Sequence, residues 1–575
     1  MSSVQRPSGR PGLGLASPHG LATHAGKCVV EQGGNAVDAA VAAAITLSVV
    51  YPHQCGVGGD LMALVAVPDG RVLAVNATGA APAGVVLGDL ATVGSMPSRG
   101  PDTVTVPGAA AGWATLSRLA GRLPFPRLFD FAVACATEGV PVSPGLAHVL
   151  SHGQELLGRD PGMRAVFYPD GVPPAVNSVL TQPALARTLA AIAETHASAL
   201  YSGDVGKALV AFLRGHGAAL STWDLTRHDT EITAPIGRVF GGEEYLTAPP
   251  NSQGVHLLQI LGALDVHSSV SDPFDSAAKV CARVFQAAAD DRAAYLADPR
   301  CAPVDIEYLL SDKRIAELSC DAPQLSPRIT SAPRSTGDTA AVVSADDEGY
   351  AVSLIQSLFQ SFGSGLLDAA TGIVAHNRGS AFSLDPTSPN YLQGGKRPAH
   401  TLLPVITRSG GEITGAHGTM GGLAQPQIHA QFAAYLRAGM DAADVLHRPR
   451  WAVTGRTPGD LTGTIVAEHE VPAETVDTLG SAGFPVVRRN DDAVGHGQIV
   501  RRRPDGFSAA ADPRSDGAAV TLILRDGWES HDYQAPDRRV SSEVTDRAEL
   551  PKSHEISSTE EIWRRQGRII EEYPS

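Results

Sequence analysis

The sequence predicts an α+β protein, with most helices in the first half of the chain and most strands in the second. Between residues 107 and 296, long alanine- and leucine-rich stretches read largely as helices. After Asp338 the pattern changes to short apolar runs separated by glycine-containing turns, which is typical of strands. Helices and strands that are segregated along the chain favour the α+β class.

The composition fits a globular protein without nucleic-acid or membrane partners. The chain has 575 residues, of which 43% are hydrophobic and 18% charged, and a formal net charge of −15. Six cysteines without CxxC or paired spacing indicate reduced thiols. Residues 1–14 lack the apolar core of a signal peptide, and the longest apolar run, 39–50, is shorter than the roughly 20 residues that span a bilayer. We therefore expect a soluble cytoplasmic protein.

A buried central helix is predicted at residues 33–50. Asn35 suits the N-cap, Asp38 lies in the first turn, where the helix dipole favours an acid, and Pro52 ends the helix. Its surface is alanine and valine on all sides, so we expect it to be buried. A strand pair should follow, turning at residues 68–70. The stretches 107–150, 182–200, 204–214 and 257–296 are also expected to be largely helical.

A β-hairpin is predicted where the second half begins. Two apolar runs flank the acidic turn Asp346–Gly349, which makes Thr339 the first residue of a central strand. Strands at 402–407 and 412–418 and a helix at 425–438 should follow. The tail 534–575 is polar, and a capping box at Ser558–Glu561 predicts a short amphipathic helix. That helix would either dock on a partner subunit in a homodimer or pack on its own chain.

Patterns for metal, phosphate and serine-elbow chemistry are missing from the sequence. It has no HExxH, no ordered His/Cys cluster among its nineteen histidines, and no GxSxG. The glycines at 56–59 do not match GxGxxG or GxxxxGK[ST], and close backbone packing explains them better. We expect neither a metal nor another cofactor.

Several short blocks resemble, in order and spacing, the γ-glutamyltranspeptidase family of N-terminal-nucleophile hydrolases. The blocks are Gly33–Ala40, Gly56–Gly59, Thr105–Gly108, Ala248–Gly254, Asp291–Arg292, Asp298–Pro299, Asp338–Thr339, Phe362–Gly365, Asn377–Gly379, Lys396–Pro398, Gly421–Gly422 and Asp512–Arg514. Each block alone is a weak signal. Together they extend over roughly residues 12–530 and identify the chain as a member.

The resemblance implies a four-layer αββα sandwich made as a precursor that cleaves itself before a threonine. Here the cut would fall between Asp338 and Thr339, giving a large subunit, 1–338, tightly associated with a small subunit, 339–575. A hydroxyl is a poor nucleophile and needs an adjacent base. The α-amine freed by cleavage, with a pKa of about 7.7–8.0, can be that base, whereas the amide of the precursor cannot.

Three further positions match catalytic positions of the family. Ser357 lies where the family has a second threonine that supports the nucleophile, and Gly421 and Gly422 match its oxyanion pair. Backbone N–H groups of this kind are typically worth about 10²–10³ in rate. The structural alternatives are a tight turn for the glycines and a solvent-facing strand position for Ser357.

The γ-glutamyl recognition residues of the family are replaced in this chain. Thr78 stands where transpeptidases have the arginine that binds the glutamyl carboxylate, and Ala381 stands where they have the aspartate that binds the ammonium group. Losing both removes the strongest charge-assisted contacts. Glutathione and other γ-glutamyl compounds are therefore not the expected substrates.

Other replacements resemble a transpeptidase-like branch that includes oxamate amidohydrolase and cephalosporin acylases. Phe359 replaces an asparagine, His400 and Thr401 replace two serines, and Arg378 replaces a glutamine. Arg378 would be a new anion anchor for a short acyl group that bears a carboxylate or keto acid. The alternative for Arg378 is a structural arginine bonding loop carbonyls.

Three functions stay open at this point. The first is a self-cleaving threonine hydrolase that forms an acyl-Thr339 ester with a small anionic substrate. It would cut either an amide or a carbon–carbon bond, in the second case releasing an oxalyl-type fragment in a pathway such as antibiotic biosynthesis. The second is a true γ-glutamyltransferase or glutathione hydrolase, and the third is an uncleaved binding protein with the same fold.

Overall fold

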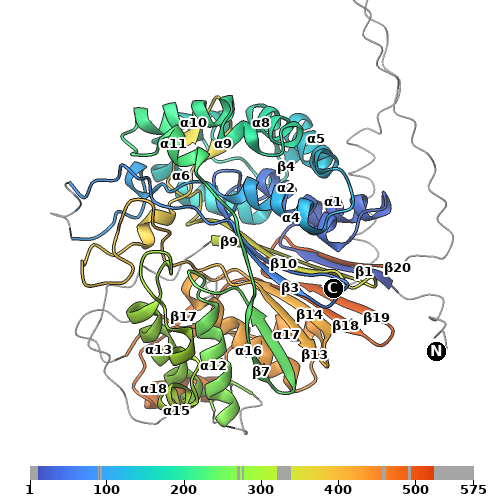
Figure 1. Ribbon diagram of the computed structural model, residues 1–575, viewed down its shortest axis with the longest axis vertical. Coiled ribbons are helices and arrows are strands. Elements are labelled where there is room, and N and C mark those ends of the chain that lie inside the picture. Colours follow the sequence, from blue (N-terminus) through green and yellow to red (C-terminus); the bar gives the residue numbers. More distant parts are fainter. Residues whose placement is uncertain are drawn as a thin grey trace, which may run out of the picture. The chain divides into compact units, whose positions relative to one another are not determined.

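Two antiparallel sheets stack face to face, and helices cover both outer faces (Figure 1). The computed structural model describes residues 11–88, 90, 94–267, 272–274, 277–319, 338–455, 462–489 and 494–523. All of them belong to one unit, Gly9–Leu524. The order of layers is helix, sheet, sheet, helix, which confirms the predicted α+β sandwich.

The first sheet has seven strands in the order β20-β1-β9-β10-β2-β3-β6. Their bounds are β1 Pro11–Ser17, β2 Asp60–Ala66, β3 Val72–Asn76, β6 Glu231–Thr233, β9 Asp338–Asp346, β10 Ala351–Phe359 and β20 Ala518–Ile523. The predicted hairpin is β9 and β10, in which Ala345 pairs with Ala351. Because β9 also pairs with β1, Thr339 lies near the start of a central strand, as expected.

The second sheet has six strands in the order β19-β18-β14-β13-β8-β7. Their bounds are β7 Ile236–Phe240, β8 Glu243–Thr247, β13 Val405–Ser409, β14 Glu412–Thr419, β18 Gly497–Arg503 and β19 Gly506–Ala511. Apolar side chains fill the space between the sheets, among them Met62, Val343 and Ile355 of the first and Ile406 and Val500 of the second. Burial of this shared face holds the two sheets together.

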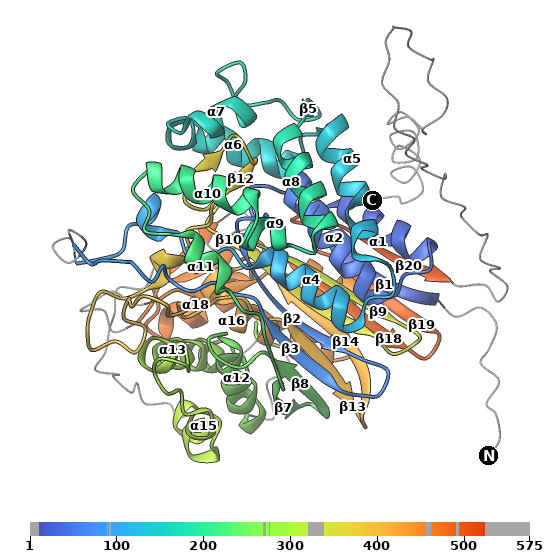
Figure 2. The same cartoon turned by 45° about the horizontal axis from the view of Figure 1, so that its top comes forward.

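Helices from the first half of the chain cover the first sheet (Figure 2). They are α1 Gly20–Glu31, α2 Ala36–Val50, α4 Ala109–Ala120, α5 Asp130–Glu138, α6 Pro144–Leu157, α7 Pro161–Phe167, α8 Pro183–Glu194, α9 Ser198–Tyr201, α10 Asp204–Gly215 and α11 Thr222–Thr226. All fifteen residues of α2 are buried, and Asn35 forms a capping box with Asp38. The predicted central helix and its cap are confirmed.

Helices on the second sheet come from both halves of the chain (Figure 1). They are α12 Gly254–Val266, α13 Ala278–Tyr295, α14 Ile306–Leu309, α15 Asp312–Leu318, α16 Gln425–Arg437, α17 Ala442–His447 and α18 Ala473–Ser481. Leu257 and Leu261 of α12 share a core cluster with Val284 and Phe285 of α13. This side also carries a small sheet of β15 Trp451–Val453, β16 Ile465–Glu468 and β17 Val486–Arg489.

Three of the stretches predicted to be largely helical are helical as expected, and each is divided into separate helices. The stretch 257–296 holds two helices, α12 and α13, and Pro273 lies between them, where a helix interior would exclude it. The stretch 182–200 splits into α8 and α9 because Ala197 adopts a left-handed backbone with φ of 69°. The stretch 107–150 is interrupted between α4 and α6 by the 3₁₀ turn Phe125–Phe129 and by a short strand after α5.

Two sequence predictions fall on residues that the structure does not describe. The helix expected after Ser558, with the tail 534–575, lies outside the described residues, and so does Cys320. Within the described part of the chain, no helix is both long and apolar enough to cross a membrane.

Candidate active site

The Thr339 and Ser357 hydroxyls meet where β9 begins and β10 ends. Thr339 Oγ1 donates to Ser357 Oγ at 3.3 Å, and Ser357 Oγ donates to the carbonyl oxygen of Asp338 at 2.6 Å. Both hydroxyls thus adjoin the peptide bond between Asp338 and Thr339, where cleavage is predicted. Thr339 is 2% and Ser357 1% exposed, so the alternative of a solvent-facing Ser357 is wrong.

An irregularity at the end of β10 brings a backbone donor to Ser357. The pairing register shifts between Gln356 and Phe359, and Phe359 stands opposite Asp338. Phe359 has a φ of 81°, uncommon for a residue with a side chain, and its N–H donates to Ser357 Oγ at 2.7 Å. The strained backbone thus places a donor on the hydroxyl that contacts the Asp338 carbonyl.

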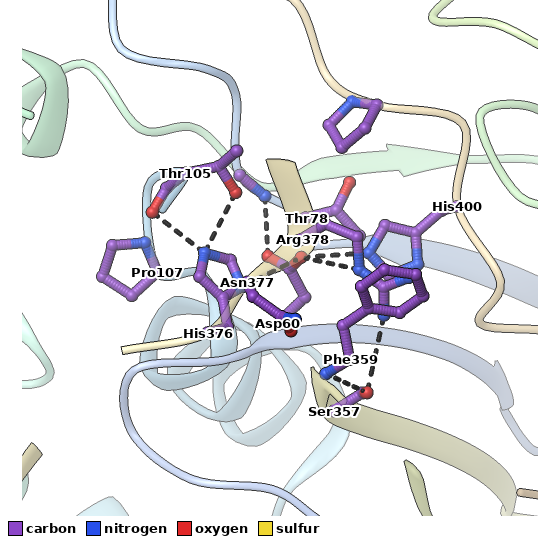
Figure 3. Close-up of polar contacts among 12 residues, drawn as sticks. Asp60, Thr78, Thr105, Pro107, Ser357, Phe359, His376, Asn377, Arg378 and His400 are labelled. Carbon is purple, nitrogen blue, oxygen red and sulfur yellow. Dashed lines mark hydrogen bonds and ion pairs between the residues drawn. The ribbon is translucent and has the colours of Figure 1, made fainter. Parts of the chain in front are cut away.

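Arg378 is a fully buried cation beside the Ser357 hydroxyl (Figure 3). It begins a 3₁₀ turn, Arg378–Ala381, and donates through Nη1 to Thr401 Oγ1 at 2.9 Å and through Nη2 to Ser357 Oγ at 3.4 Å. The Phe359 ring stacks on its guanidinium at 4.0 Å. Among the described residues, Arg378 donates to two hydroxyls. A structural arginine would instead donate to loop carbonyls.

The pKa of Arg378 is lowered, but the side chain stays positively charged at neutral pH. Its pKa is lowered to about 9. Burial is the main cause, the charge of Arg292 acts in the same direction, and the Asp60 carboxylate opposes both. Arg378 Nε lies 3.8 Å from Asp60 Oδ2. A buried cation of this kind suits an anionic partner.

Asp60, the first residue of β2, is the centre of the polar network (Figure 3). It accepts from the Gly79 N–H at 2.8 Å and from His400 Nε2 at 3.0 Å, and His376 Nδ1 lies 3.4 Å away. Burial raises its pKa, but His376 and His400 outweigh burial and hold the pKa well below its usual range. Asp60 is therefore ionised and balances the charge of Arg378.

His400 serves this network as a neutral donor. Burial, followed by repulsion from Arg378, lowers its pKa to about 3. Its Nδ1 accepts from the Leu402 N–H at 3.2 Å, so its proton is on Nε2, which faces Asp60. Thr78 lies in the same region, where its hydroxyl donates to Asn76 Oδ1 at 2.7 Å.

Gly58 and Gly59 pack closely against other backbone, as predicted for the glycines at 56–59, whereas a Cβ on Gly56 would meet nothing within 4 Å. A Cβ on Gly58 would come within 2.1 Å of the Val374 carbonyl oxygen, and one on Gly59 within 2.6 Å of the Ser357 carbonyl oxygen. This close approach brings Asp60 beside the β10 terminus. The sequence reasoning missed Asp60 and His376, although Asp60 directly follows the glycine run and His376 directly precedes the Asn377–Gly379 block.

Gly421 and Gly422 follow β14 and begin a 3₁₀ turn, Gly422–Ala424, that leads into α16. Their φ values of 139° and 52° favour glycine. Gln253 Nε2 donates to the carbonyls of both Gly422 and Thr401 at 2.8 Å. Gln253 therefore connects this turn to Thr401, the residue that accepts a hydrogen bond from Arg378. The first N–H groups of a helical turn lack intrahelical acceptors. The turn therefore suits an oxyanion site, and that role stays a prediction.

A cavity of about 410 Å³ adjoins the network. Of the predicted substrate-binding residues, Phe359, Ala381 and Thr401 line it, whereas Arg378 lies behind the Phe359 ring. Thr78 and His400 belong to the buried network and are not among the described lining residues. Among the described residues, no group of three or more His, Cys, Asp or Glu side chains could hold a metal ion.

Arg292 of α13 also lines the cavity, and the sequence reasoning missed it as a site residue. Asp291, the preceding residue, pairs with Arg314 of α15 at 2.5 Å, whereas Arg292 Nε donates to Gln253 Oε1 at 3.0 Å. Adjacent helical residues point about 100° apart, so the two side chains reach different partners.

The chain is similar to known proteins over most of its length. The family described as Gamma-glutamyltranspeptidase matches residues 22–522. The oxamate amidohydrolase proenzyme of Klebsiella pneumoniae is 34% identical over 522 residues, which cover 88% of this chain and 98% of that protein. The glutathione hydrolase proenzyme of Escherichia coli is 28% identical over 530 residues, with coverage of 87% and 90%.

A solved structure shares the fold. The crystal structure of a cephalosporin acylase from Bacillus halodurans aligns with a TM-score of 0.80 at 30% identity, covering 90% of this chain and 97% of that chain. The alignment extends over both halves of the sandwich. Sequence and architecture agree, and the chain belongs to the γ-glutamyltranspeptidase family as a hydrolase.

Proposed function

We propose that the chain is a self-processing threonine hydrolase that cuts an acyl bond of a small anionic substrate other than a γ-glutamyl compound. One observation carries the proposal: Ser357 Oγ donates to the Asp338 carbonyl oxygen at 2.6 Å while the Thr339 hydroxyl lies against the same Ser357. A nucleophile and an oxyanion donor thus adjoin the peptide bond predicted to be cut.

Self-cleavage would begin with attack of Thr339 Oγ on the Asp338 carbonyl carbon. Negative charge would develop on the carbonyl oxygen, to which Ser357 already donates. Arg378 and the Phe359 N–H donate to Ser357 Oγ and make its own proton a stronger donor. The C–N bond breaks, and the proton lost by the Thr339 hydroxyl passes to the nitrogen. Water then hydrolyses the ester, leaving a carboxylate on Asp338 and a free α-amine on Thr339.

Substrate turnover would reuse the same place. The α-amine of Thr339 takes the hydroxyl proton as Oγ attacks the acyl carbon, and that proton passes to the leaving group. Water then attacks the acyl-Thr339 ester and regenerates the hydroxyl. We assign the N–H groups of Gly421 and Gly422 to the oxyanion in this step, because their turn is tied through Gln253 to Thr401.

The charges of the site support a short acyl group that bears a carboxylate. Arg378 is the cation next to Ser357, whereas Thr78 and Ala381 offer no charge to a glutamyl group. The similarity to an oxamate amidohydrolase proenzyme favours an amide bond. Carbon–carbon cleavage in an antibiotic pathway would use the same ester and stays a prediction, as do the cytoplasmic location and the homodimer.

Gel electrophoresis and mass spectrometry test the proposal. Wild type should give two chains, 1–338 and 339–575, with Thr339 at the new N-terminus, whereas Thr339→Ala should stay as one chain. Thr339→Ser keeps a hydroxyl and should still be cut. A wild-type protein that stays uncut would contradict the proposal and support the binding-protein alternative.

The mass of the covalent adduct on the 339–575 chain identifies the acyl group. Wild type incubated with oxamate and quenched in acid should carry the mass of an oxalyl group on the 339–575 chain. γ-Glutamyl-p-nitroanilide should leave no adduct and release no nitroaniline. The reverse result would instead assign the protein as a γ-glutamyl hydrolase.

A further inference from the structure

Two polar side chains on the cavity wall, one buried and one partly buried, take no part in the proposed acyl chemistry. They are His256 of α12 and Arg292 of α13, and both line the 410 Å³ cavity together with Phe359 and Thr401. His256 is 1% exposed. Because Thr401 bonds Arg378, this wall adjoins the side of the cavity where the acyl group would bind.

The hydrogen-bond network fixes which atom His256 presents. Gln259 Nε2 donates to Asp291 Oδ2 at 2.7 Å and to the Leu309 carbonyl at 3.1 Å, so Gln259 Oε1 is the atom that faces His256. His256 Nδ1 lies 2.8 Å from that oxygen and must donate its proton to it. Nε2 then carries a lone pair, and no described residue bonds it.

His256 stays neutral at physiological pH. Burial lowers its pKa to about 4, and Arg292 lowers the pKa in the same direction. The ring is therefore an acceptor at Nε2 and not a second cation. An acceptor that is buried, unpartnered and on a cavity wall calls for a donor on the ligand.

Arg292 provides a cation next to this acceptor. Its Nε donates to Gln253 Oε1 at 3.0 Å, and its Nη atoms have no acceptor among the described residues. Burial lowers its pKa to about 10, which leaves it charged at neutral pH. Gln253 also holds the Gly422 carbonyl, so Arg292 lies one side chain away from the predicted oxyanion turn.

We propose that Arg292 and His256 bind the leaving group of the substrate, and that this group has a carboxylate next to a hydrogen-bond donor, as in an amino acid. Arg292 would donate to the carboxylate, and an N–H or O–H of the ligand would donate to His256 Nε2. Ile260, Phe285 and Val453 on the same wall would contact an apolar side chain. This inference rests on the proposed function, because Arg378 is taken to bind the acyl end. The substrate class is then an N-acyl amino acid with a short carboxylated acyl group.

Equilibrium binding of three small probes to the purified full-length protein tests this subsite without turnover. N-acetylglycine has both a carboxylate and an N–H donor, propionate has only the carboxylate, and N-ethylacetamide has only the donor. Calorimetry should show that N-acetylglycine binds tightest. Arg292→Gln should weaken it about tenfold or more, because a charged hydrogen bond is lost, and abolish its advantage over N-ethylacetamide.

His256→Asn isolates the acceptor. The asparagine Nδ2 can replace Nδ1 as donor to Gln259, whereas the Nε2 lone pair is lost. Binding of N-acetylglycine should weaken about threefold to tenfold, and its advantage over propionate should disappear. Arg71→Gln removes the same charge from an exposed turn and should leave all three affinities unchanged.

The outcomes separate this inference from the proposed function. If the wild-type protein shows no preference among the probes, or if both variants keep its preference, the inference is overturned. If the preference exists but the wild type stays one uncut chain, the subsite is supported and the threonine-hydrolase proposal fails. If the protein is cut and acylated but shows no preference, only the subsite is lost.

Discussion

At the scale of single residues, Ser357 links the proposed nucleophile Thr339, the Asp338 carbonyl and the buried Arg378. Its oxygen accepts from Thr339, Phe359 and Arg378, and its proton goes to the Asp338 carbonyl. Arg378 can therefore act twice, first by polarising Ser357 in the precursor and then by binding the acyl carboxylate in the mature enzyme. The two roles predict different kinetic effects.

Arg378→Met should impair substrate binding more than processing. The variant removes the cation but keeps a side chain of similar length beneath Phe359, and Asp60 keeps its bonds from Gly79 and His400. We expect the KM for oxamate to rise about tenfold or more, because a charge-assisted contact is lost. Processing should become slower but still reach completion.

Steady-state kinetics with oxamate and a time course of chain cleavage measure the two effects separately. Arg378→Lys restores the charge but cannot reach both hydroxyls in the same way, so it should recover binding only in part. An unchanged KM combined with abolished cleavage would restrict Arg378 to the precursor step.

The part of the site predictable from sequence is the part that lies in ordered motifs. Thr339, Ser357 and Arg378 lie at positions that match motifs of the family in order and spacing, and the structure brings them together. Arg292 and His256 lie on helices whose cavity-facing sides depend on how α12 and α13 pack. No local pattern distinguishes them from other buried helical residues, so only the fold could reveal them.

At the scale of elements, α2 holds β9, the strand that contains the proposed nucleophile Thr339 near its start. Asp346, at the end of β9, accepts from the Ala36 N–H at 2.9 Å, and Ser344 Oγ donates to the Ala36 carbonyl at 2.7 Å. The first turn of α2 is therefore bonded directly to β9. Sequence predicted this helix well because its cap and its apolar composition agree, whereas in the largely helical stretch 257–296 it did not locate the break at Pro273.

Asn35→Ala should destabilise the folded chain measurably. Asn35 Oδ1 accepts from the N–H groups of Val37 and Asp38, and its Nδ2 donates to the Ala120 carbonyl at 2.7 Å. Loss of an N-cap typically costs about 0.5–2 kcal/mol, and we expect the upper half of that range because the helix is fully buried.

Urea unfolding followed by circular dichroism measures the loss in free energy of unfolding, with Asn35→Ser as the matched control. Serine keeps a capping oxygen but not the bond to Ala120, so it should recover only part of the loss. If Asn35→Ala unfolds at the same urea concentration as wild type, the cap is not limiting for stability.

At the scale of the whole molecule, several histidines are buried in their neutral form. Burial is the main cause that lowers the pKa of His19, His228 and His256 to about 4 and of His400 and His429 to about 3. These side chains come from both halves of the sandwich. Below a pH of about 6.5 they would be protonated in the unfolded chain while remaining neutral in the folded one.

Stability should therefore fall as the pH is lowered from about 6.5 towards 4. Each such histidine contributes up to about 1.4 kcal/mol per pH unit in this window, because the unfolded state binds a proton that the folded state does not. Asp346, whose pKa burial raises to about 6, acts in the opposite direction, but one carboxyl cannot offset five histidines. The depressed pKa of Asp60 adds a further loss below the ordinary aspartate pKa of about 3.9.

Thermal unfolding measured from pH 8 to pH 4 tests this prediction. The midpoint should stay nearly level above pH 7 and decline below about 6.5, and calorimetry in buffers of different ionisation enthalpy should detect proton uptake on unfolding near pH 5. His429→Gln removes one titrating group and should reduce that uptake by about one proton. A midpoint that holds or rises between pH 7 and pH 5 would show that these histidines are already protonated in the folded protein.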